Sequence, residues 1–300
     1  MKNYIVLDLG GSSVKYGVFS DDSLILSDKK THQNKGANHI YETIFSVIDK
    51  CMKICEKRPS GIVLGSPGYI DTVQGKVIGC SPNLKEWENA EPKKVISEKY
   101  NMPVQAENDA NLMVFGEASV YGYKKNVLGY TFGTGIGSGF IQKDEIFCGS
   151  NFAGSEAGHT VINPKGRLCG CGKIGCIEAY ASASSIFKIF NEKYPERNFS
   201  NIKAVLDQCQ KEQKLNKILT EITDLTAVSI ANTVSILNPE VILIGGGLSE
   251  IASYPFEELK EKTLSYIPAA QKKSLIFEKA RFGNKAALIG GLETAKKLWG

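Results

Sequence analysis

Two glycine-rich turns, one in each half of the chain, are the segments best suited to bind phosphate. The first covers residues 8–13 (DLGGSS) and the second covers residues 133–137 (GTGIG), each between apolar, β-branched runs that predict strands. Glycine permits positive φ and leaves backbone N–H groups accessible, and the hydroxyls of Ser12, Ser13 and Thr134 can donate as well. Each turn alone could be an ordinary hairpin. Two of them suggest that a polyphosphate is gripped from both sides.

Neither turn has the context of a P-loop or of a dinucleotide-binding G-x-G-x-x-G motif, because no helix follows directly. Asp8 ends a buried apolar run beside the first turn. Its charge would repel phosphate, but it could hold Mg²⁺ or the water shell of Mg²⁺ next to the phosphates. Lys15 could offset phosphate charge.

A polar segment at residues 107–111 (ENDAN) stands at a predicted strand-to-helix junction. Asp109 could simply cap the helix, because a carboxylate is favoured at the positive end of the helix dipole. The carboxyl end of a strand is also where α/β folds bind ligands. There Asp109 could take the proton from a substrate hydroxyl as that hydroxyl attacks phosphorus. The residues alone leave both interpretations open.

A metal site is indicated by His159, Cys169, Cys171 and Cys176, which offer the four ligands that tetrahedral Zn²⁺ needs. Four protein ligands leave no open position, so the zinc would be structural; the alternative is three packed or free thiols. Nearby glycines let the short loop fold around a metal. For the other cysteines we expect buried packing rather than ligation; these are Cys51, Cys55, Cys80, Cys148 and Cys209.

Two carboxylates flank this motif. Glu156 lies shortly before the histidine, and Glu178 follows the last cysteine at the predicted start of a helix. A bound metal would fix both segments and could turn the two carboxylates and the imidazole toward one pocket. Carboxylates are good acceptors for the vicinal hydroxyls of a sugar. Without the neighbouring metal motif, two surface acids would be the default interpretation.

Composition limits the function classes. Three hundred residues with 42% hydrophobic content can bury a large core and favour two domains. The net charge of +4 comes without any block of like charges, so nucleic acid or membrane partners have no electrostatic support. No signal peptide and no long apolar stretch is visible, which favours a cytoplasmic protein.

The pattern of elements repeats. A three-strand meander around the first turn is followed by helices and strands, and a second meander surrounds the second turn. This predicts an α/β chain built from two related halves. Strands are expected at 4–9, 14–19, 24–27, 61–65, 104–107, 127–132, 138–142, 145–147 and 241–244, and helices at 40–55, 92–100, 108–120, 218–237 and 285–298.

Together the motifs resemble the ROK family, which comprises repressors, open reading frames and sugar kinases, over essentially the whole chain. The resemblance implies the actin-like, ribonuclease-H-like ATPase fold, with two related α/β lobes around a central cleft. We expect a small lobe from 1–116 plus 287–300 and a larger lobe from 117–286. The segments that carry the resemblance are DLGGSSVKYGVF, GSPGYID (65–71), NDAN (108–111), FGTGIGSG (132–139), EAGH (156–159), CGCGKIGCIEAY (169–180) and PEVILIGGG (239–247).

The resemblance also implies roles for single residues. Asp109 would be the catalytic base, and His159 would bind both the sugar and zinc through its two ring nitrogens. The segment 81–84 (SPNL) resembles the glucokinase-like branch, and Asn83 would touch the sugar. The remaining expected sugar ligands are Asn108, Glu156 and Glu178; the phosphates would be lined by Gly10, Gly11, Thr134 and Gly135, and the adenosine by Gly246 and Gly247.

Two positions depart from the common family pattern: Ala157 stands where a larger apolar residue is usual, and Ser155 where glycine is common. Both belong to the sugar-side loop, so they bear on substrate identity. The repressor branch carries a helix-turn-helix domain before the first turn, and Asp8 lies too close to the start of this sequence to leave room for one. This favours the kinase branch.

The sequence therefore predicts an ATP- and Mg²⁺-dependent hexokinase acting on the 6-hydroxyl of glucose. N-acetylmannosamine, N-acetylglucosamine, fructose and β-glucosides are alternative substrates, and polyphosphate is an alternative donor. Two other classes stay open: a non-catalytic sugar sensor or regulator, and an ATPase without a sugar. A homodimer is expected from the family, with no nucleic acid or membrane partner.

Overall fold

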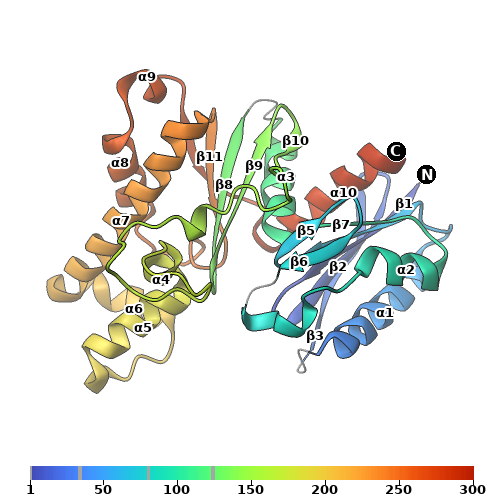
Figure 1. The fold of residues 1–300 in the computed structure, drawn as a ribbon, viewed down its shortest axis with the longest axis horizontal. Coiled ribbons are helices and arrows are strands. Elements are labelled where there is room, and N and C mark those ends of the chain that lie inside the picture. Colours follow the sequence, from blue (N-terminus) through green and yellow to red (C-terminus); the bar gives the residue numbers. More distant parts are fainter. Residues whose placement is uncertain (1, 33–35, 80–81, 123–125) are drawn as a thin grey trace. The chain divides into compact units, whose positions relative to one another are not determined.

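The computed structural model describes residues 2–32, 36–79, 82–122 and 126–300, with the backbone alone at 82, 83 and 284. It divides into two compact units, which we describe separately. Unit one comprises Met1–Gly122, Ile146–Gly154 and Asn284–Gly300, and unit two comprises Tyr123–Glu145 and Ser155–Gly283. Figure 1 shows the elements of both units.

Unit one is built on a five-stranded sheet of order β3-β2-β1-β4-β7. The first three strands form an antiparallel meander, and β1, β4 and β7 run parallel. The strands are β1 (Asn3–Leu9), β2 (Ser13–Ser20), β3 (Ser23–Thr31), β4 (Gly61–Ser66) and β7 (Val104–Asn108). A separate hairpin pairs β5 (Tyr69–Asp71) with β6 (Lys76–Gly79).

Helices cover both faces of this sheet, which explains why every residue of β1 is buried. Alternate side chains such as Ile5 and Leu7 join the core beneath helix α1 (Ala37–Ile54), whereas Val6 points to the opposite face and meets Gly291 of α10 (Ala286–Trp299). Helix α3 (Asp109–Tyr121) packs on α10, and α2 (Pro92–Tyr100) packs beside β7.

The crossing of α3 and α10 depends on glycine. A Cβ at Gly116 would lie 2.1 Å from the carbonyl oxygen of Ala286, and a Cβ at Gly290 would lie 1.9 Å from that of Leu112. Real Cβ contacts are never this short, so the two backbones can touch only without side chains at these positions. This contact holds the C-terminal helix against the helix that begins at Asp109.

Unit two repeats the sheet order as β10-β9-β8-β11-β12. Again an antiparallel meander is extended by two parallel strands. The strands are β8 (Val127–Phe132), β9 (Ile136–Gln142), β10 (Glu145–Ile146), β11 (Val241–Gly245) and β12 (Ile276–Lys279). The helices are α4 (Glu178–Ala181), α5 (Ala183–Lys193), α6 (Ile202–Cys209), α7 (Gln213–Leu237), α8 (Phe256–Tyr266) and α9 (Ala269–Lys272).

The repeated strand order confirms the predicted pair of related α/β halves. The core of unit two combines strand residues such as Tyr130 and Ile242 with Leu219 and Ile230 of α7. The sequence-based prediction did not include β5, β6 or β12, and it placed the start of α7 too late in the chain. In the part of the chain that the structure describes, no helix is both long and apolar enough to cross a membrane.

Candidate functional site

The carboxyl ends of the three parallel strands of unit one meet at one edge of the sheet. Asp8 on β1 stands opposite Gly65 on β4, and Gly65 stands opposite Glu107 on β7. Helix α3 begins directly after β7, and a Cβ at Gly65 would lie 3.6 Å from the Cα of Asp109. The structure therefore brings the two predicted acidic residues, Asp8 and Asp109, to the same sheet edge.

The helix cap at this edge is Asn108. Its side-chain oxygen accepts a hydrogen bond from the N–H of Asn111 at 3.0 Å, and its amide nitrogen donates to the carbonyl of Gly68 at 3.0 Å. Asp109 is the first helical residue, and its Oδ1 accepts from the N–H of Ala110 at 2.9 Å. The capping function that the sequence left open for Asp109 is thus carried by its neighbour.

Electrostatics make Asp109 easy to protonate. Burial and the negative charge of Asp8 raise the pKa of Asp109 from 3.8 to about 7, against hydrogen bonding to the backbone and the charge of Lys15. Burial also raises the pKa of Asp8, which is opposed by Lys15, whose Nζ lies 3.4 Å from Asp8 Oδ2. A carboxylate with a pKa near neutrality suits a general base.

Glu107 supports this corner, although no separate role was predicted for it. It is buried, and its Oε1 accepts hydrogen bonds from the N–H of Asn108 at 2.7 Å and from the Nδ2 of Asn111 at 3.0 Å. Burial raises the pKa of Glu107, which the two hydrogen bonds oppose. Its position inside the ENDAN segment was the available signal.

The first glycine turn is closed by a hydrogen bond of 2.8 Å from the N–H of Gly10 to the carbonyl of Ser13. Gly11 and Ser12 are exposed. The turn does not use the positive φ that glycine permits, because neither Gly10 nor Gly11 lies in the left-handed region. A Cβ at Gly11 would meet no atom of the described structure within 4 Å, so the glycine leaves space rather than permitting a strained turn.

The second glycine turn is held within unit two. The N–H of Gly133 donates to the carbonyl of Gly135 at 2.9 Å, and Ser184 Oγ donates to the carbonyl of Thr134 at 2.6 Å. A Cβ at Gly133 would also meet nothing within 4 Å. No glycine of this turn has positive φ, so this turn too does not use that freedom of glycine.

The turn after β11 lies beside this second turn. Gly246 has φ of +89°, and a Cβ on it would lie 2.4 Å from the carbonyl oxygen of Phe132. The N–H of Leu248 donates to the same carbonyl at 2.9 Å. Gly247 is exposed, and a Cβ there would meet nothing within 4 Å. The structure thus places the residues expected at the phosphates and at the adenosine next to one another.

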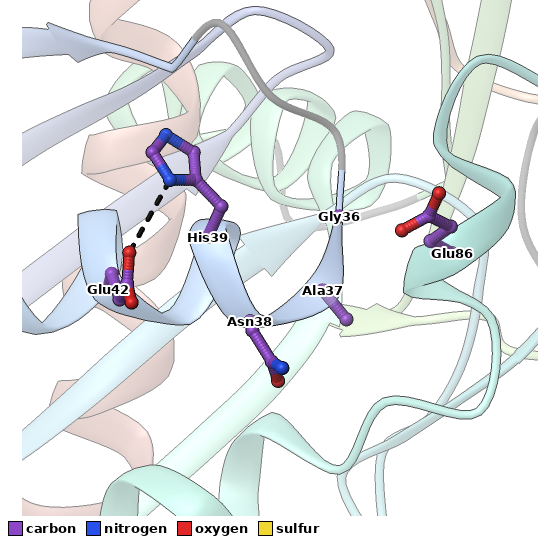
Figure 2. A pocket seen from close by; sticks show the side chains of 6 residues that line it. All are labelled: Gly36, Ala37, Asn38, His39, Glu42 and Glu86. Atoms are coloured by element: carbon purple, nitrogen blue, oxygen red, sulfur yellow. Dashed lines mark ion pairs between the residues drawn. The ribbon is translucent and has the colours of Figure 1, made fainter.

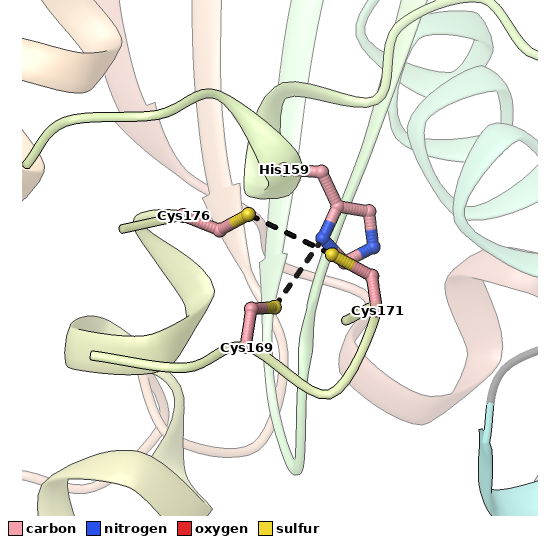
Figure 3. A group of neighbouring side chains, drawn as sticks. All are labelled: His159, Cys169, Cys171 and Cys176. Carbon is pink, nitrogen blue, oxygen red and sulfur yellow. Dashed lines mark hydrogen bonds between the residues drawn. The ribbon is translucent and has the colours of Figure 1, made fainter. Parts of the chain in front are cut away.

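The predicted metal ligands converge. The nearest ligand atoms of His159, Cys169, Cys171 and Cys176 all lie within 4.8 Å of one another. Figure 3 shows one ring nitrogen of the histidine facing the thiols and the other turned away. His159 Nδ1 lies 3.7 Å from Cys169 Sγ, and the sulfurs of Cys171 and Cys176 are 3.7 Å apart. Tetrahedral zinc with Zn–S bonds of about 2.3 Å needs sulfurs roughly 3.8 Å apart, so the donor set fits.

Loop geometry explains why these ligands gather. Gly172 and Gly175 both have φ of +88°, and a Cβ at Gly175 would lie 1.8 Å from the carbonyl oxygen of Asn163. An isolated bridge between Val161 and Cys176 joins the histidine segment to the cysteine loop. Gly172 and Gly175 therefore allow the short loop to turn tightly, which is the function that we expected of the loop glycines.

Glu178 connects the metal ligands to the second glycine turn. Its Oε2 accepts a hydrogen bond from the N–H of Ile136 at 2.9 Å, and its Oε1 lies 3.5 Å from Cys169 Sγ. Glu156 precedes the short 3₁₀ turn Ala157–His159, and its carbonyl accepts from the N–H of His159 at 3.0 Å. These contacts place the Glu178 carboxylate beside the ligand set, whereas the predicted convergence of both acids on one pocket stays a prediction.

Some predicted residues lie elsewhere or outside the description. The side chain of Asn83 and the residue Cys80 lie outside the described residues. Of the cysteines expected to pack in the core, Cys51 and Cys209 are buried, but Cys55 and Cys148 are only partly buried. Cys55 directly follows the end of α1, and Cys148 lies in the loop after β10, so neighbouring elements cover both thiols only in part.

A separate hollow of about 430 Å³ opens at the start of α1. His39 forms an ion pair with Glu42 there, with 3.4 Å between Nδ1 and Oε2 (Figure 2). None of the predicted site residues lines this hollow, and we assign it no function; its lining consists of Gly36, Ala37, Asn38, His39, Glu42 and Glu86.

Comparisons with known proteins agree with the motifs. A glucokinase from Thermotoga maritima is 31% identical over 280 residues, which cover 88% of this chain and 87% of that one. A xylose repressor from Caldicellulosiruptor bescii is 30% identical over 264 residues, covering 82% of this chain and 66% of the repressor. The crystal structure of a ROK hexokinase from Thermus thermophilus superposes with a TM-score of 0.86 at 25% identity, covering 99% and 98% of the two chains. The sequence model of the ROK family matches residues 4–297, and this chain therefore belongs to the ROK family.

Proposed function

We propose that this protein is a sugar kinase that transfers the γ-phosphoryl group of ATP to a hexose, with glucose and its 6-hydroxyl as the substrate and position. The observation that carries the proposal is Asp109, which starts a helix at the carboxyl edge of a parallel sheet with its pKa raised to about 7. The glucokinase relative, with similarity over most of both chains, supports the same class of reaction.

Asp109 would accept the proton of the attacking hydroxyl, which increases the nucleophilicity of that oxygen as it approaches phosphorus. Asp8 would hold Mg²⁺, which would neutralise charge on the transferred group. Lys15 balances the charge of Asp8 in the described structure and would offset phosphate charge as well. In unit one, Gly10, Gly11 and the adjacent serine N–H groups would face phosphate.

In unit two, Thr134 and Gly135 would bind phosphate, and Gly246 and Gly247 would lie beside the adenosine. Their adjacency in the fold supports this assignment, because Gly246 packs on the residue that precedes the glycine turn. Exclusion of water around the transferred group would limit the hydrolysis of ATP.

The sugar would be held by Asn108, Glu156, His159 and Glu178, with Asn83 as a further contact. We propose that zinc is held by His159 and the three cysteines, which close the site to substrate and make the metal structural. With Nδ1 toward the cysteines, the other ring nitrogen of His159 stays available to a hydroxyl. The family expectation of a homodimer is part of the proposal, and light scattering of the purified protein tests it.

A substrate panel tests the proposed reaction. Purified protein with MgATP is offered glucose, mannose, fructose, a β-glucoside, N-acetylglucosamine and N-acetylmannosamine, and ADP release and the phosphorylated product are measured. We expect glucose 6-phosphate to form with the highest kcat/KM. Sugar binding without transfer to any sugar would support a sensor, and ATP turnover that no sugar changes would support an ATPase. Either result would refute the proposal. Polyphosphate in place of ATP tests the alternative donor.

A further inference from the structure

His32, just after β3, is attached to the first glycine turn by two hydrogen bonds. Its ring Nε2 lies 3.0 Å from the carbonyl oxygen of Gly10, and its backbone N–H donates to the carbonyl of Ser12 at 2.9 Å. The side chain is only 5% exposed. Because a carbonyl can only accept, Nε2 is the donor of this hydrogen bond.

These two bonds fix the direction of the turn's N–H groups. The carbonyl of Gly10 and the N–H of Gly11 belong to one planar trans peptide, so they point in opposite directions. The same holds for the carbonyl of Ser12 and the N–H of Ser13. By holding both carbonyls on its own side, His32 turns both N–H groups away from itself. Among the described residues, none accepts a hydrogen bond from the N–H of Gly11.

Packing alone does not explain a histidine at position 32. Nδ1 is buried without a hydrogen-bond partner in the described structure. An apolar side chain of similar size would fill the same space without burying a polar atom that lacks a partner among the described residues. The bond to Gly10 is the feature of this histidine that an apolar side chain cannot supply.

We propose that His32 is a positioning residue that holds the first glycine turn in the conformation that binds the phosphates of the donor. The inference rests on the proposed kinase function and adds to it a residue that never touches the nucleotide. Its effect is expected on the nucleotide side of the reaction, because both hydrogen bonds of His32 go to the first glycine turn.

Four variants test this inference. His32→Leu fills the space without a donor, and His32→Gln places an amide N–H as many bonds from Cα as the ring Nε2. His32→Asn is polar but too short to reach Gly10. His39→Leu is the matched control, because among the described residues the His39 ring pairs with Glu42 on α1, away from the first glycine turn.

The measurements are KM for ATP, KM for the hexose, kcat, the affinity for MgADP by calorimetry, and the melting temperature. We expect His32→Leu and His32→Asn to weaken MgADP binding and raise KM for ATP about tenfold, the usual effect of losing one oriented hydrogen bond. KM for the hexose should stay within about twofold, and His32→Gln should recover most of the loss. His39→Leu should match the wild type.

Unchanged MgADP affinity and KM for ATP in folded His32→Leu or His32→Asn would overturn the inference. Equal losses in both substrates, or no recovery with His32→Gln, would also overturn it, because they indicate a general structural role. If His32→Leu does not fold, the comparison of the Gln and Asn variants decides. A wild type that binds MgADP but phosphorylates no hexose would refute the proposed function instead, while the MgADP measurements would still test His32.

Discussion

Replacing Asp109 with asparagine should separate catalysis from stability. The general base must be ionised to accept a proton, so kcat/KM of the wild type should rise with pH through the pKa of about 7 and level off above pH 8. At pH 6 it should be about one tenth of its plateau. Asp109→Asn cannot accept the proton, and we expect kcat to fall about 10²–10⁴-fold while hexose binding remains.

The same pKa predicts the opposite effect on folding. Asp109 titrates at 3.8 when unfolded and at about 7 when folded, so the folded state binds its proton more tightly. The ionised side chain therefore destabilises the fold above pH 7, and this penalty disappears as the pH falls below 4. A shift of this size corresponds to a penalty on the order of 4 kcal/mol. Asp109→Asn should remove it, so the variant should unfold at higher denaturant than the wild type at pH 8, but not at pH 4.

The assay combines pH–rate profiles at saturating MgATP with urea unfolding at pH 4 and pH 8. Asp22→Asn is the control, because Asp22 is exposed and its ion-pair partner in the described part of the chain is Lys296. Its free energy of unfolding should change by less than about 1 kcal/mol, the usual value of a surface ion pair. Near-normal turnover of Asp109→Asn would remove Asp109 from the mechanism. Equal destabilisation of this variant at both pH values would refute the account of its buried charge.

Three further predictions concern unit two. Gly133→Ala should fold normally, with a free energy of unfolding within about 0.5 kcal/mol of the wild type. It should nevertheless raise KM for ATP about tenfold, because its Cβ occupies only the space proposed for phosphate. Gly246→Ala should instead lose more than about 2 kcal/mol of stability, since φ is +89° and the backbone of Phe132 blocks a Cβ. Equal loss of stability in the two alanine variants would contradict this distinction. Cys171→Ala should lose bound zinc, melt at a lower temperature and raise KM for the hexose. Cys55→Ala is the control. Elemental analysis that finds no zinc in the wild type would refute this prediction. Ser155→Gly should stabilise the protein by about 0.5 kcal/mol, because Ser155 has φ of +63° and its buried hydroxyl has no partner in the described structure. A lower melting temperature of this variant would contradict the prediction.

Local patterns were sufficient for most elements of the sheets. The run at 127–132 and the helix at 92–100, with proline at its first turn, have the predicted bounds in the structure. Helix α7 starts five residues earlier than predicted, at Gln213, because its first turn is polar and lacks the apolar spacing. Strand β12 was missed because it is short and mostly exposed, so its residues show no clear alternation.

The chemistry of single residues depended on tertiary contacts. Spacing alone grouped the four predicted metal ligands, because a short loop cannot hold its three cysteines far apart. By contrast, nothing local distinguished Asn108 from Asp109 as the helix cap; the contact of Asn108 with Gly68 decides it. His32 could not be found at all, because its contact with Gly10 depends on the pairing of β2 with β3.

Glycines separate the requirements of folding from those of binding in this protein. Gly116, Gly290 and Gly246 face backbone atoms closer than any Cβ can approach, so the fold itself requires them. Gly11 and Gly133 face open space and have no left-handed backbone, so the fold would accept alanine there. A glycine that the fold does not require, in a turn whose neighbours fix its peptide planes, leaves room for a ligand close to the backbone. This criterion agrees with the phosphate-binding role that we propose for the two turns, and alanine at these positions tests binding without disturbing the fold.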